Sequence, residues 1–160
     1  MLKHVLVPLD GSTLAEKALD TVKYILPPGG KITLLTAVQN RDQLPLVQVE
    51  GGEIPIDQYL EHMALRVRLE GFEVEPDIRV GDAAEVIAQT AITLGVDIIA
   101  MCGHERSGLE QLIGSSVTQR VLAISLCPVL VIPNTIRERA PQPVPIEETA
   151  PDVNLGLDVA

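Results

Sequence analysis

The sequence predicts an α/β fold, in which a single domain forms a doubly wound, five-stranded parallel sheet with helices on both faces. Short apolar runs of strand length alternate along the chain with segments whose apolar residues recur at helical spacing. Turn and helix-capping residues separate the two kinds of segment. The chain has 160 residues, of which 46% are hydrophobic and only 2% aromatic, so it can bury one aliphatic core.

The first half of the chain predicts two strands and two helices, with a polar segment in the middle. The first strand ends at the turn Asp10-Gly11-Ser12, and Thr13-Leu-Ala-Glu16 forms a capping box that begins a helix. The expected elements are a strand over 4–9, a helix from 13 that Pro27 and Pro28 end, a strand over 32–38, a loop or lid over 39–54, and a helix from 56 that Gly71 ends.

The second half predicts three more strands and two more helices. Asp82-Ala-Ala-Glu85 and Ser116-Val-Thr-Gln119 are further capping boxes, each followed by apolar residues at helical spacing. The expected elements are a strand over 72–80, a helix from 82, a central strand over 96–101, a loop over 103–114, a helix over 116–125 and a strand over 128–132. Open parallel sheets bind ligands at the carboxyl ends of strands where the strand order reverses. The segments expected at such a site are therefore 10–12 and 102–116.

Composition excludes several classes of function. The formal net charge of -10 argues against nucleic acid, whose binding depends on Lys and Arg, and against anionic membrane surfaces. The two cysteines and three histidines have no metal-ligand spacing, so we expect no metal site. No apolar run reaches membrane-spanning length, and the first is too short for a signal peptide. We therefore expect a soluble, cytoplasmic protein that binds neither nucleic acid nor membranes.

The composition changes near the end of the chain. From Pro141 onward the last 20 residues hold four prolines and four acids but no Lys or Arg. This predicts an acidic tail over 140–160, extended or disordered, outside a domain that spans 1–139. The alternative is that the tail forms an arm along a partner subunit.

Six segments share their order and spacing with one known family. They are Val-Leu-Val-Pro-Leu-Asp-Gly-Ser at 5–12, Val-Gly-Asp-Ala-Ala-Glu at 80–85, Val-Asp-Ile-Ile-Ala-Met at 96–101, Arg-Ser-Gly-Leu at 106–109, Ser-Val at 116–117 with Arg-Val-Leu at 120–122, and Cys-Pro-Val-Leu-Val at 127–131. In these segments the chain resembles the universal stress protein family, over about residues 2–133. The resemblance implies a Rossmann-like fold of the adenine nucleotide alpha hydrolase type. It also implies a homodimer formed through the last strand, at Val129, Leu130, Val131 and Ile132.

The resemblance further implies an adenine nucleotide as ligand, either ATP or AMP, with Mg²⁺ if ATP binds. The candidate nucleotide-binding residues are Pro8, Leu9, Asp10, Val38, Met101, Cys102, His104, Glu105, Ser115, Ser116 and Val117. Family members that bind ATP carry Gly-x-x-Gly, nine residues, and then Gly-Ser or Gly-Thr. An ungapped alignment puts Cys102, Glu105 and Ser115 at the three glycine positions, and only Ser116 matches. A carboxylate about 5 Å from one phosphate charge costs on the order of 3 kcal/mol at an effective dielectric constant near 20.

Several candidate residues also have a purely structural interpretation. Asp10 faces a ribose or metal–phosphate site by resemblance, but it is also a turn acid that can cap its own backbone. Val38 lines an adenine pocket by resemblance, or it is simply core. An inert thiol is the favoured interpretation of Cys102, and helix capping is sufficient to explain Ser116. No Ser-His-Asp arrangement is present, so we expect no catalytic residues.

Two functions remain open from the sequence. The first is a stress-response regulatory module that acts by binding, in which ATP binding is weak or lost and a surface or the tail recruits an unknown protein. The alternative is a functional ATP or AMP sensor, whose loop over 102–116 closes over the nucleotide. Weak ATP hydrolysis would need a positioned base or a metal site, for which the sequence offers only Asp10.

Overall fold

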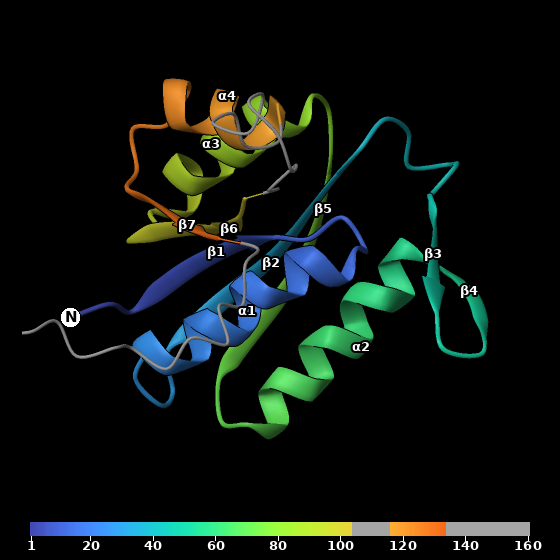
Figure 1. Ribbon diagram of the computed structural model, residues 1–160, viewed down its shortest axis with the longest axis horizontal. Helices are drawn as coiled ribbons and strands as arrows, with labels where there is room; N and C mark the ends of the chain where they lie inside the picture. The colour runs from blue at the N-terminus through green and yellow to red at the C-terminus, as the bar shows by residue number, and fades with distance from the viewer. Residues whose placement is uncertain (104–115, 134–160) are drawn as a thin grey trace, which may run out of the picture.

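The computed structural model describes residues 1–103 and 116–133 (Figure 1). The main sheet has five parallel strands in the order β5-β2-β1-β6-β7. These strands are β1 (His4–Pro8), β2 (Lys31–Val38), β5 (Glu73–Val80), β6 (Ile98–Cys102) and β7 (Val129–Ile132). The chain adds β2 and β5 on one side of β1 and then returns to add β6 and β7 on the other. The predicted doubly wound, five-stranded fold is therefore confirmed.

Two helices cover each face of this sheet (Figure 1). One layer holds α1 (Thr13–Ile25) and α2 (Ile56–Leu69), and the other holds α3 (Ala83–Leu94) and α4 (Ser116–Ile124). Successive side chains of a strand point to opposite faces. In β1, Val5 and Val7 pack in the layer of α1 and α2, whereas Leu6 packs beneath α3 and α4. The central strands are apolar on both faces because both faces are covered.

The starts of α1 and α4 differ from the sequence prediction. Helix α1 is capped by Ser12, whose Oγ accepts a hydrogen bond from the N–H of Ala15 at 3.2 Å. The box predicted to start at Thr13 is therefore wrong by one residue, because Thr13 is already helical. The predicted N-cap at Asp82 is confirmed, since its Oδ1 accepts a hydrogen bond from the N–H of Glu85 at 3.2 Å. The Glu85 carboxylate lies 4.0 Å from Nη2 of Arg120. Helix α4 begins at Ser116 itself, so the box predicted to start there is likewise placed one residue too late. The residue before it lies outside the described part of the chain.

The segment over 39–54 is more ordered than a loop. It contains an antiparallel hairpin of β3 (Leu46–Val49) and β4 (Gly52–Pro55), so the expectation of a polar loop is wrong here. The sequence signal for this hairpin is weak because each strand has only four residues. A hairpin of this length is marginally stable by itself. Val47 is 5% exposed and joins the core beside α1 and α2. Burial of this side chain attaches the hairpin to the domain.

The predicted boundary at residue 139 and the tail over 140–160 fall outside the described residues, and so does most of the predicted loop over 103–114. The last described strand, β7, ends at Ile132. Within residues 1–103 and 116–133, no helix combines the length and the apolarity needed to cross a membrane.

Candidate functional site

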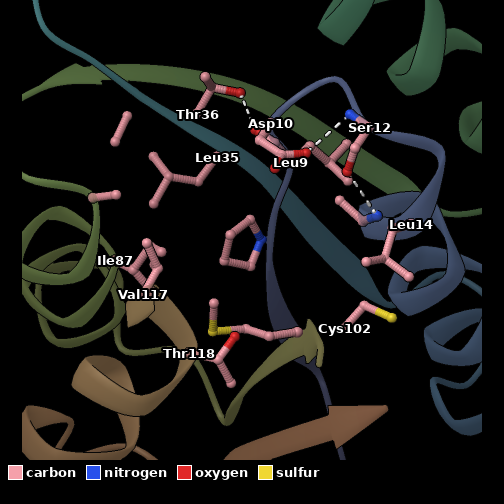
Figure 2. A pocket seen from close by; sticks show the side chains of 15 residues that line it. Leu9, Asp10, Ser12, Leu14, Leu35, Thr36, Ile87, Cys102, Val117 and Thr118 are labelled. Carbon is pink, nitrogen blue, oxygen red and sulfur yellow. Dashed lines mark hydrogen bonds between the residues drawn. The ribbon is translucent and has the colours of Figure 1, made fainter. Parts of the chain in front are cut away.

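A cavity of about 190 Å³ opens where the strand order reverses between β1 and β6 (Figure 2). The ends of β1, β2 and β6 form part of its wall, and α1, α3 and α4 complete it with residues near their N-termini. This is the position at which open parallel sheets bind ligands. Six candidates from the sequence line it, namely Pro8, Leu9, Asp10, Met101, Cys102 and Val117.

Hydrogen bonds between β1 and β2 hold one wall of the cavity in place. The N–H of Leu9 donates to the carbonyl oxygen of Leu35 at 2.8 Å. Thr36, which is 4% exposed, donates its hydroxyl to the carbonyl oxygen of Leu9 at 2.6 Å (Figure 2). This bond satisfies a buried hydroxyl and a carbonyl at the point where both strands end. These two hydrogen bonds fix the position of Leu9 relative to the end of β2.

The turn after β1 brings the polar groups of the cavity together. Asp10 is exposed, and its Oδ1 accepts a hydrogen bond from the N–H of Ser12 at 2.9 Å (Figure 2). Ser12 in turn caps α1 through its own hydroxyl. The structural role considered for Asp10 is thus present, and the same residue lines the cavity. Its contact with a ligand stays a prediction.

The sulfur-containing side chains at the end of β6 are buried. Met101 lies in the layer of α3 and α4, and Cys102 lies on the opposite face of the sheet. Burial raises the pKa of the Cys102 thiol, and the nearby positive charge of Lys17 opposes this less strongly. A raised pKa keeps the sulfur protonated near neutral pH, which supports the interpretation of an inert thiol.

Val38 does not line the cavity, although the residue before it, Ala37, does. It is 3% exposed and packs in the core beside α1 and α2. Its carbonyl oxygen accepts a hydrogen bond from the N–H of Gly81 at 3.0 Å, at the start of the turn into α3. Its predicted contact with adenine remains untested. His104, Glu105 and Ser115 lie outside the described residues, and so does the side chain of Ser116.

Sequence reasoning missed several residues of the wall. Thr36 and Ala37 come from the end of β2, and Ile87 and Thr118 come from α3 and α4. A signal existed for the first two, because they come near the end of the second predicted strand, and the carboxyl ends of parallel strands lie at the same edge of a sheet. No local pattern points to Ile87 or Thr118, since each is one of several inward-facing residues on its helix.

An ion pair joins α3 to α4. These two helices line the cavity from the face of the sheet opposite α1. Arg120 of α4 lies 2.8 Å from Oδ2 of Asp82, the residue that caps α3. The Arg120 guanidinium holds the pKa of the Asp82 carboxyl below its usual value, and the N–H of Glu85 adds to this effect. Among the described residues, no three His, Cys, Asp or Glu side chains gather closely enough to hold a metal ion.

Comparisons with known proteins agree on one group of relatives. The model of the universal stress protein family matches residues 1–133. Universal stress protein MJ0577 of Methanocaldococcus jannaschii is 29% identical over 154 residues, covering 82% of this chain and 95% of that protein. Universal stress protein Sll1654 of Synechocystis is 30% identical, covering 83% of this chain and 87% of that protein.

Solved structures give the same result for the fold. The structure of MJ0577 superposes with a TM-score of 0.58 and covers 83% of this chain and 96% of that chain. A universal stress protein in complex with cAMP superposes with a TM-score of 0.63 at 21% identity, covering 84% and 98% of the two chains. A universal stress protein from Archaeoglobus fulgidus in complex with dAMP gives 0.58 at 19% identity, with 82% and 98% covered.

Proposed function

Because this chain belongs to the universal stress protein family, we propose that it is a stress-response regulatory module that acts by binding rather than by catalysis. Its ligand is an adenine nucleotide with a single phosphate. The cavity at the end of β1 takes the base and the sugar. The observation that carries this proposal is the position of that largely apolar cavity at the reversal of strand order.

The size of the cavity favours a small ligand. Sites for drug-sized molecules span about 300–1,000 Å³, whereas this cavity measures about 190 Å³. The aliphatic side chains of Leu35, Ile87 and Val117 suit the flat faces of a base, and Thr36 and Asp10 bring polar atoms to the same wall. The phosphate would lie outside this space, toward the start of α4, where backbone N–H groups favour an anion.

The sequence of the neighbouring segment favours one phosphate over three. Cys102, Glu105 and Ser115 stand where ATP-binding family members carry glycine, so close approach of the backbone to a phosphate chain is hindered. The carboxylate of Glu105 adds repulsion that grows with the number of phosphates. Two structural relatives were solved with cAMP and dAMP, which each carry one phosphate.

Titration calorimetry with AMP, ATP and GMP tests this function. We expect AMP to bind, ATP to bind no more tightly than AMP, and GMP to bind more weakly. Ala83→Leu fills the cavity from the first turn of α3 and should weaken AMP binding at least about tenfold. Ala123→Leu makes the same substitution at an exposed position of α4 and should leave binding unchanged. Binding of ATP more than about tenfold tighter than AMP would refute the single-phosphate proposal.

A second measurement asks whether a nucleotide accompanies the protein from cells. The chain has no Trp and only two Tyr, so the protein itself absorbs little at the wavelengths where adenine absorbs. Denaturing the purified protein and chromatographing the supernatant would reveal a bound nucleotide directly. If neither AMP nor ATP binds and no nucleotide is released, the nucleotide site has decayed and the alternative of a protein-recruiting module is favoured.

We also propose that the protein forms a homodimer through β7. The N–H groups of Ile99 and Gly103 donate to the carbonyl oxygens of Pro128 and Ile132, both at 2.9 Å. Residues 128, 130 and 132 therefore direct their backbone groups toward β6, while residues 129 and 131 direct theirs outward. The strand carries no charge and no internal proline, and an apolar edge of this kind favours pairing with a second copy about a two-fold axis.

Sedimentation velocity tests the dimer. Val131 is 37% exposed on the edge strand, and Val131→Lys should shift the protein toward monomer by placing charge at the pairing surface. Val80→Lys makes the same change at an exposed valine of β5 and should leave the size unaltered. A monomeric wild-type protein would refute the dimer.

A further inference from the structure

The opposite edge of the sheet, β5, has a different construction from β7. The N–H of Glu73 donates to the carbonyl oxygen of Gly30, and the N–H of Gly81 donates to that of Val38, both at 3.0 Å. The odd-numbered residues of β5 therefore direct their backbone groups toward β2. The even-numbered residues 74, 76, 78 and 80 direct theirs outward, where an added strand would have to pair.

Two of the outward carbonyl groups, those of Val74 and Ile78, already accept hydrogen bonds from side chains. Arg68 of α2 donates to the carbonyl oxygen of Val74 twice, from Nε at 3.0 Å and from Nη2 at 2.7 Å. Arg41, in the segment after β2, donates to the carbonyl oxygen of Ile78. Between these two positions stands Pro76, which has no N–H to offer.

The guanidinium group of arginine is well suited to bind an exposed carbonyl oxygen of an edge strand. A guanidinium presents its donors in a rigid fork, so Arg68 can direct two of them at one oxygen. Its third nitrogen, Nη1, lies 3.8 Å from the carboxylate of Glu61, two turns earlier on the same face of α2, which helps to hold the side chain over the strand. The Arg68 contacts join the edge strand to the helix just before it, whereas the Arg41 contact joins it to the segment after β2, 37 residues earlier in the chain.

We propose that Arg41, Arg68 and Pro76 close the β5 edge to strand addition, so that a second copy of this chain can pair only at β7. A sheet with one open edge pairs about a two-fold axis and then stops. A sheet with two open edges can pair β5 of one copy with β7 of the next, and such a head-to-tail contact repeats without closing. The prediction that assembly stops at two copies rests on the homodimer proposed above. The proposal that the β5 edge is closed does not depend on it.

The test opens the edge and measures assembly. In the triple variant Arg41→Ala/Arg68→Ala/Pro76→Val, the outward carbonyl groups lose their donors and residue 76 gains an N–H. We expect its weight-average sedimentation coefficient to rise with protein concentration, beyond that of the wild-type protein. Lys3→Ala/Arg66→Ala removes two positive charges from exposed side chains away from this edge and should behave like wild type.

A variant with four substitutions identifies the contact that forms. Adding Val131→Lys to the triple variant should abolish the larger species if β5 pairs with β7. Persistence of the larger species would overturn head-to-tail pairing. A triple variant that keeps the wild-type circular dichroism spectrum and the wild-type size overturns the closure itself.

Two milder variants cover the case in which the triple variant does not fold. Pro76→Val alone restores one N–H, and Arg68→Lys keeps the charge but loses the fork. Unchanged size in both would also overturn the proposal. A monomeric wild type would refute the dimer through β7, but the comparison of each variant with wild type would still test β5.

Discussion

Replacing Gly11 by Ala tests whether the β3–β4 hairpin holds the turn that follows β1. Gly11 has a φ of +84°, and a Cβ at this position would lie 2.6 Å from Cγ2 and 2.9 Å from Cγ1 of Val47. Val47 is a buried residue of the hairpin with little room to move. The substitution therefore combines an unfavourable backbone conformation with a steric clash against a short, branched side chain.

The two contributions can be estimated separately. A left-handed conformation costs a residue with a Cβ about 1–2 kcal/mol, and overpacking of a core typically costs about 1–3 kcal/mol. Gly11→Ala should therefore lower the free energy of unfolding by about 2–5 kcal/mol. Val47→Ala removes two buried carbons and should lower it by about 2 kcal/mol. In the double variant the two closest carbons of Val47 are gone and only its Cβ remains, 3.3 Å from the added carbon. The loss should therefore be about 1–3 kcal/mol smaller than the sum of the single losses.

Urea unfolding followed by far-ultraviolet circular dichroism measures this cycle in a protein without Trp. Gly51→Ala is the matched control, because Gly51 has a φ of +97° but no atom within 4 Å of its added Cβ. It should lose only the backbone contribution of about 1–2 kcal/mol. Additive losses at Gly11 and Val47, or equal losses at Gly11 and Gly51, would refute the packing of the hairpin against this turn.

Three further predictions concern the nucleotide site, the tail and the start of β1. Glu105→Gly removes a charge and a side chain from the segment expected near the phosphates, so calorimetry should find ATP binding tightened at least about tenfold. Glu105→Gln, which keeps the bulk, separates repulsion from steric hindrance, and unchanged ATP binding in both variants would count against the alignment. A chain ending at Arg139 should keep the melting temperature and size of the full chain, whereas dissociation or a large loss of stability would identify the tail as a structural arm. Asp97 accepts hydrogen bonds from the N–H groups of Lys3 and His4, at 2.7 and 2.9 Å, which lower the pKa of its carboxyl. The stability that this carboxylate adds is complete above its unfolded pKa of about 3.9 and is lost as pH falls through the lower folded value. The difference in unfolding free energy between wild type and Asp97→Asn should therefore be constant near neutral pH and narrow in acid, and a difference independent of pH would contradict this role.

The sequence by itself determined the order of the strands of the main sheet and of the four helices, and the edge of the sheet at which the cavity opens. Helical spacing and strand-length apolar runs depend on residues only a few positions apart, so they can be recognised in the sequence before the fold is known. The same holds for the cap at Asp82, which bonds to Glu85 three residues later. Once the elements alternate, right-handed crossovers leave few topologies, and the turn at Asp10 must then lie at the carboxyl edge of the sheet. Six of the candidate residues accordingly line one cavity.

Only the tertiary structure decided the features that depend on contacts between distant segments. The hairpin over 46–55 exists because Val47 packs against the turn at Gly11, which no local pattern in two four-residue strands could reveal. Thr36 joins the cavity wall through its bond to Leu9, 27 residues earlier in the chain. The two edges of the sheet differ because Arg41 reaches the carbonyl group of a strand residue 37 positions away. Such contacts form between groups that chain folding alone brings together, so periodicity and composition carry no signal of them.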